Sequence, residues 1–288
     1  MLFLIFAVLC GASLSFCFKI FKKMGIDSLQ CIFFNYLTAI AVSVFLNGAD
    51  LASIAKTVHI ANEENWLLLA IIEGFFFMGG FLVMAASTHR AGVAITNVSA
   101  RASMVIPVVA SYLIYKEAAP SWLALVLMLV AMVMIFGQAG SGGKLSWRDW
   151  ILPVGVMLEY GICDFLLKVL RAGASAEGQG GIMLFIFTTA AISCGVCYLI
   201  RGNFRDHGFS WKSVPGGILL GLLNSGCTAL MLKALGQMDA VLFYPLYNAG
   251  VVFLSLVAGL IFFKEKLRGI QIGGILLATL SIVLMLSL

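Results

Sequence analysis

The chain has 288 residues, of which 62% are apolar and only 11% charged, with a net charge of +5 and a mean hydropathy of +1.07. A soluble domain is about half apolar and about a quarter charged, so this composition excludes an ordinary globule and indicates an integral membrane protein. The basic residues stand singly or in pairs at the ends of apolar runs, which argues against nucleic-acid binding.

Membrane-length apolar runs follow one another along the whole chain. A helix needs about 20 mainly apolar residues to cross the hydrocarbon core. The longest link between such runs, 48–64, contains Glu63-Glu64 and is expected to lie in water. We predict an all-α integral membrane protein with ten transmembrane helices. Their expected ranges are 2–21, 28–47, 65–88, 91–115, 121–138, 150–171, 180–200, 213–236, 239–263 and 269–287.

The first run does not have the pattern of a cleavable signal peptide, because its basic residues, Lys19, Lys22 and Lys23, come after the apolar stretch. All seven cysteines fall within the predicted helices, so no disulfide framework is expected. The spacing Gly217-xxx-Gly221, repeated at Gly269-xxx-Gly273, predicts close packing of helices.

An internal repeat relates the two halves of the chain. Glu117 and Glu265 each follow a lysine at a turn between two runs and are 148 residues apart. The same shift pairs the turns 87–92 and 235–240, and a shift of 149 pairs Lys19 with Lys168. Five helices per repeat is an odd number, so the second copy enters the membrane from the opposite side. We predict two inverted-topology five-helix repeats, 1–138 and 150–288, a plan common in secondary transporters.

The chain resembles the ten-helix, EamA-type members of the drug/metabolite transporter superfamily. The resemblance covers essentially the whole chain and rests on two segments, GASLSFCFK ending at Lys19 and KEKLRGIQIGG from Lys264 to Gly274. The first-half turn KEAAPSWLALV lacks the corresponding glycines, and the family usually has glycine where Lys116 and Lys264 stand. The resemblance implies transport of small metabolites through a cavity between the halves, by exchange or ion coupling.

Arg101 stands near the middle of the run 91–115. A charged side chain at that depth costs at least ~2.5–3.5 kcal/mol and normally faces a cavity or a partner. Glu73 and Glu159 lie near the same depth in other runs and are the expected partners of Arg101. The alternative is a buried ion pair that only fixes helix packing.

The buried acids outnumber the buried cations. Asp164 and Lys168 are four residues apart on one predicted helix and are expected to form a gating or structural ion pair. Glu73 and Glu159 are then the candidate proton carriers, since burial disfavours the charged form of a carboxylate.

Uncharged polar residues extend the candidate substrate site. Asn248 aligns under the shift of 148 with Ala100, next to Arg101. Tyr244 and Tyr247 could instead belong to an interfacial aromatic belt. The residues expected to line the cavity are Asn35, Asn97, Asn224, Tyr247 and Asn248.

These residues predict a secondary transporter rather than an enzyme. The three histidines stand in separate links without metal spacing, and the sequence has no P-loop or HExxH motif, so no catalytic residue, metal or cofactor is expected. Arg101 would hold a carboxylate or phosphate through its planar fork, and the mixed charges favour an amino-acid-like or other zwitterionic or anionic solute. The alternative is a lipid or lipid-phosphate flippase. Expected partners are the solute, membrane lipids and a coupling proton, for a monomer or weak homodimer.

The distribution of Lys and Arg predicts the orientation in a bacterial inner or plasma membrane. Twelve lie in or beside the links after odd-numbered helices, and five lie in or beside the links after even-numbered ones. Since positive charge stays on the cytoplasmic side, we predict non-cytoplasmic termini, whereas many relatives in the resembled family have cytoplasmic termini.

Overall fold

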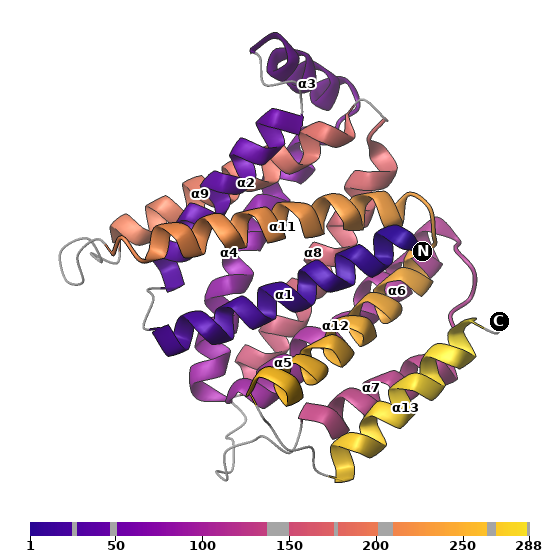
Figure 1. The fold of residues 1–288 in the computed structure, drawn as a ribbon. Coiled ribbons are helices and arrows are strands. Elements are labelled where there is room, and N and C mark those ends of the chain that lie inside the picture. Colours follow the sequence, from indigo (N-terminus) through magenta and orange to yellow (C-terminus); the bar gives the residue numbers. More distant parts are fainter. Residues whose placement is uncertain are drawn as a thin grey trace. The chain divides into compact units, whose positions relative to one another are not determined.

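The computed structural model describes residues 1–24, 28–46, 51–136, 150–175, 178–200, 210–263 and 269–286. Every regular element among these residues is a helix (Figure 1). The helices are α1 (Leu2–Met24), α2 (Ser28–Leu46), α3 (Leu51–Glu63), α4 (Leu67–Arg90), α5 (Val93–Ala102), α6 (Val105–Tyr115), α7 (Trp122–Phe136), α8 (Ile151–Gly173), α9 (Gln179–Ile200), α11 (Ser213–Leu235), α12 (Ala240–Phe263) and α13 (Gly269–Leu286).

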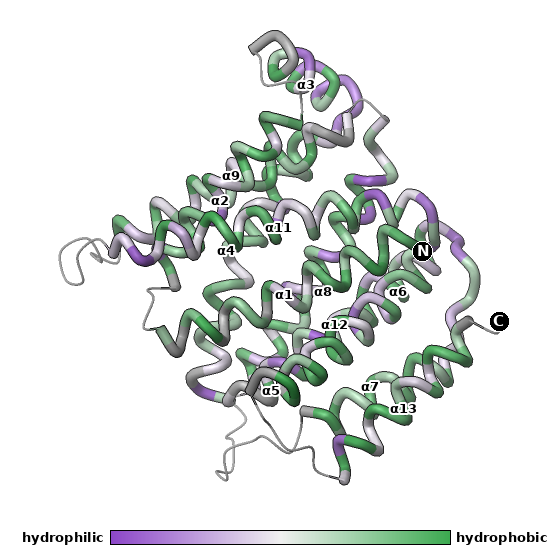
Figure 2. Tube along the Cα trace, viewed as in Figure 1, coloured by the Kyte–Doolittle hydropathy of each residue, from purple (hydrophilic) through white to green (hydrophobic). Residues whose placement is uncertain are grey.

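Six helical segments of the described chain are long and apolar enough to cross a membrane. Figure 2 shows hydrophobic residues along most of the trace. The predicted all-helical, membrane-type architecture is thereby confirmed, and each predicted run agrees with the observed helix boundaries to within three residues. The six segments are Leu29–Leu46, Leu67–Thr88, Ile95–Tyr115, Gly181–Ile200, Ser213–Leu235 and Ala240–Ala258.

The predicted link 48–64 contains a helix, α3, which was not predicted. Thr57 and Ala61, one turn apart, are buried, while His59 and Glu63 on the outer face are exposed and pair across 3.3 Å. The helix is therefore amphipathic, with a polar face suited to water.

The predicted span 91–115 is two helices, because α5 and α6 are separated by a turn at Ser103-Met104. Pro107 has no N–H, and its ring would clash with the carbonyl of Ser103 in a continuous helix. The Ser103 carbonyl instead accepts a tighter bond from the N–H of Ile106, at 3.0 Å. The break begins two residues after Arg101.

The chain forms two compact units, and each takes residues from both predicted repeats. Unit 1 contains Met1–Met78 and Val169–Gly236, and unit 2 contains Gly79–Lys168 and Gln237–Leu288. Helices α4 and α8 therefore contribute to both units. The predicted boundary between the repeats falls in 137–149, outside the described residues.

Within unit 1, α11 packs along α2 and α1, and α2 packs along α9. Side chains added at Gly217 and Gly221 would meet the α2 backbone near 2.7 Å, at the carbonyls of Cys31 and Asn35. The predicted role of this glycine pair in close packing is therefore observed.

Within unit 2, α7 and α13 form the most extensive helix pair, and α12 packs on α6. The close approach to α7 uses Gly273 and Gly274, whereas Gly269 faces open space. Of the predicted pair, only Gly273 therefore packs closely on a neighbouring helix. An apolar cavity of about 260 Å³ lies among α7, α12 and α13.

Candidate functional site

Arg101, on the last turn of α5, donates a hydrogen bond to a neutral amide on α12. Its Nη1 lies 3.1 Å from Oδ1 of Asn248, which is only 3% exposed. The Asn248 Nδ2 donates to the carbonyl of Tyr244 at 3.0 Å. This second bond directs the amide oxygen toward Arg101.

The expected ion pair between Arg101 and Glu159 does not form among the described residues. Glu159 lies on α8, where its Oε1 accepts a bond from the thiol of Cys163 at 3.3 Å. Its carboxyl group packs against Gly80 of α4, where a side-chain methyl would overlap it. The missing side chain of Gly80 thus provides the space for the Glu159 carboxyl group.

Asp164, one turn after Tyr160 on α8, interacts electrostatically with Arg101 and Glu159. No nitrogen of Arg101 lies within the 4.0 Å of an ion pair from either acid in the described structure. Within unit 2, Arg101, Glu159 and Asp164 therefore interact electrostatically, but none of the described atoms of the three forms an ion pair with another.

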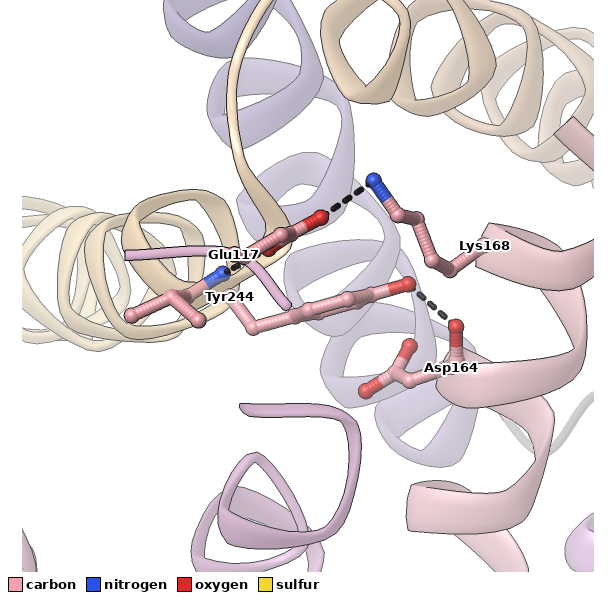
Figure 3. A network of polar contacts seen from close by, with 5 residues as sticks. Glu117, Asp164, Lys168 and Tyr244 are labelled. Carbon is pink, nitrogen blue, oxygen red and sulfur yellow. Dashed lines mark hydrogen bonds and ion pairs between the residues drawn. The ribbon is translucent and has the colours of Figure 1, made fainter. Parts of the chain in front are cut away.

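Lys168 pairs with Glu117, and not with Asp164 as the spacing of four residues predicted. The Lys168 Nζ is 2.5 Å from Oε1 of Glu117, with the two side chains 12% and 7% exposed (Figure 3). The other oxygen of Glu117 accepts the backbone N–H of Val241, at 3.1 Å, in the first turn of α12. A carboxylate is favourable there because it satisfies a free N–H and faces the positive end of the helix dipole.

Tyr244 is fully buried, so it is not an interfacial belt residue. Its hydroxyl donates to the backbone carbonyl of Asp164, which ties α12 to α8 (Figure 3). Tyr247 is half-buried and its ring stacks on Phe243 at 5.7 Å. Asn97 is half-buried one turn before Arg101 on α5.

The remaining predicted residues belong to unit 1. Asn224 of α11 donates to Asn35 of α2 at 3.3 Å, so these two predicted residues meet. Glu73 is fully buried on α4, next to Gly74, which leaves space for the backbone of α9. Pairing of Arg101 with Glu73 would join the two units and stays a prediction.

Sequence reasoning missed Glu117 as a site residue, although it noted Glu117 as a repeat marker. The available signal was the internal repeat. Glu117 aligns with Glu265 under a shift of 148, and Lys19 aligns with Lys168 under a shift of 149. Glu265 lies outside the described residues. Sequence reasoning also missed Gly80 and Cys163, which carry no recognisable motif.

Comparison with known proteins identifies relatives of the whole chain. No family model matches it. An uncharacterized protein of Haemophilus influenzae (strain ATCC 51907 / DSM 11121 / KW20 / Rd) is 29% identical over 284 residues, covering 97% of this chain and 95% of that protein. A crystal structure described only as that of a protein aligns with a TM-score of 0.75 at 14% identity, over 99% of this chain and 97% of that one. This likeness shows that the fold is shared over the full length.

Proposed function

We propose that the chain is a secondary transporter that moves a small polar metabolite, amino-acid-like or otherwise zwitterionic or anionic, by alternating access. The observation that carries this proposal is the hydrogen bond from Arg101 to the neutral amide of Asn248. A purely structural arginine would be expected to pair with a nearby acid such as Glu159. A neutral partner holds the guanidinium in place and leaves its charge available to an anionic group.

The break between α5 and α6 supports this proposal. Discontinuous helices commonly form the binding sites of secondary transporters, since their freed backbone groups line a cavity. Here the break follows Arg101 directly, at Ser103-Met104. It thus lies beside the residue proposed to bind solute.

Helix pairing supports the proposed inverted repeat of ten spans. Within unit 2, α7 packs on α13 and α6 packs on α12; within unit 1, α2 packs on α9. Each of these pairs joins helices that occupy corresponding places in the two sequence repeats. Together with the resemblance to EamA-type proteins, this pairing supports alternating access, for which we propose proton coupling, with Glu73 or Glu159 as the proton carrier, or exchange.

Arg101→Ala tests the proposal. Purified protein is first screened for thermal stabilisation by a metabolite library, and the stabilising solutes are then followed into proteoliposomes. We expect the variant to insert normally and to lose uptake. Arg90→Ala, at the exposed end of α4, is the control that keeps uptake. Wild-type uptake by the Arg101 variant would refute the assignment.

The apolar cavity supports the second candidate function, a lipid or lipid-phosphate flippase. Its lining residues come from α7, α12 and α13, and Thr279, a polar member, bonds its own helix at Ile275. Such a cavity suits an acyl chain rather than a polar solute. Protein-dependent movement of a fluorescent phospholipid between the leaflets of proteoliposomes, with no solute uptake, would favour this function.

A further inference from the structure

The Asp164 carboxyl group has no hydrogen bond or ion pair within the part of the chain that the structure describes. Lys168, its expected partner, is taken by Glu117. Figure 3 shows the Asp164 carboxyl group turned away from Lys168. The Tyr244 hydroxyl donates to the backbone carbonyl of Asp164 and so fixes the backbone that carries this side chain. An unpaired carboxyl group of this kind can bind a ligand without first breaking an ion pair.

Arg101 presents complementary groups to the same cluster. Its bond to Asn248 uses Nη1 and leaves the donors on Nη2 and Nε without partners in the described residues. A guanidinium can bind the two oxygens of a carboxylate side by side. Arg101 and Asp164 attract each other but do not pair, so an anionic and a cationic group are both available.

The charge balance of the cluster indicates which ligand fits. The Glu117–Lys168 pair is neutral in itself. Arg101 and an ionised Asp164 are neutral together and offer one cationic and one anionic group to a ligand. A purely anionic solute would leave Asp164 without a partner, whereas a zwitterion brings an ammonium group to it.

We infer that Asp164 determines specificity by binding the cationic group of the solute while Arg101 binds its carboxylate. The inference rests on the proposed transport function and assigns Asp164 a role different from the ion pair that its sequence spacing suggested. Glu159 is less suited to this role, because its carboxyl group is packed on Gly80 and bonded to Cys163.

The test uses purified full-length protein and the twenty standard L-amino acids as probes. Binding is measured by thermal shift and then by titration calorimetry. The tightest binder is compared with its des-amino carboxylic acid and its decarboxylated amine. We expect wild type to prefer the amino acid at least tenfold over both. Asp164→Asn should lose at least tenfold for the amino acid while keeping its affinity for the des-amino acid.

Two controls keep the test decisive. Asp239→Asn, at an exposed position before α12, should bind like wild type. The comparison of the three ligands on wild-type protein needs no variant, so it tests the inference even if Asp164→Asn does not fold. Equal wild-type affinity for the amino acid and its des-amino acid, or unchanged discrimination by Asp164→Asn, would overturn the inference. So would uptake of another solute without binding of any amino acid, although that result would leave the proposed transport function intact.

Discussion

Gly80 leaves the space that the carboxyl group of Glu159 occupies. It lies on α4 where the carboxyl group of Glu159 packs against its backbone. An added methyl group would overlap that carboxyl group, and only the flexible end of the glutamate has to move. We therefore expect a substitution at Gly80 to displace the Glu159 carboxyl group with little effect on folding.

Gly80→Ala should shift the Glu159 carboxyl group and reduce pH-gradient-driven uptake in proteoliposomes. The free energy of unfolding should change by less than about 1 kcal/mol, because alanine is a better helix former than glycine and offsets the local displacement. Gly79→Ala is the matched control, since its methyl group would meet nothing within 4 Å. Equal uptake by the two variants would show that the position of Glu159 does not matter for coupling.

The sequence identified the polar residues of the site better than their partners. Arg101 and Asn248 were both predicted, because charged and amide groups in apolar runs stand out against their surroundings. The ion pair of Lys168 was predicted wrongly, because the near partner Asp164 is visible in the sequence whereas Glu117 is 51 residues away. Long-range pairing depends on tertiary packing, which a helical spacing rule does not contain.

At the scale of elements, α12 is anchored at its start by a residue from another segment. Glu117, just after α6, accepts the N–H of Val241 and pairs with Lys168 of α8. Hydrogen bonds of α12 with α8, through Tyr244, and with α5, through Asn248, follow within two turns. The first half of α12 is thus tied to three segments by polar contacts.

Glu117→Gln should destabilise the protein by about 3 kcal/mol, because it leaves the nearly buried Lys168 charge without a partner. Lys168→Met combined with Glu117→Gln should cost less than the two single changes added together. Chemical denaturation in detergent measures the free energy of unfolding of the two single variants and of the double variant. Glu63→Gln provides the control for an exposed pair with His59 and should cost about 0.5 kcal/mol or less. An equally small effect of Glu117→Gln would show that the pair is well solvated.

Element boundaries were predictable because membrane helices need a minimum apolar length, and charged or Gly/Pro breaks limit them. The break between α5 and α6 was not predicted, although Pro107 was its signal. Pro245 shows why such a signal is ambiguous, since α12 continues through it. Whether a proline breaks a helix depends on which neighbours satisfy the freed carbonyl.

At the scale of the whole molecule, the orientation predicted from Lys and Arg is testable. A cysteine at Ser141, on a cysteine-free background, should resist a membrane-impermeant thiol reagent in intact cells and react after lysis. Asn62→Cys, on the exposed face of α3, should react in intact cells. The reverse pattern would place both termini in the cytoplasm.

The course of the chain through the two units has a consequence for the timing of synthesis. Unit 1 begins with Met1–Met78 and resumes at Val169, so the 90 residues of Gly79–Lys168 must be made in between. At about 5–20 residues per second the ribosome takes about 5–18 seconds over them. Throughout that interval α1 and α2 lack the helices α9 and α11 on which they pack in unit 1. A nascent chain stalled before Val169 would therefore expose the packing surfaces of α1 and α2 to lipid and to membrane quality control.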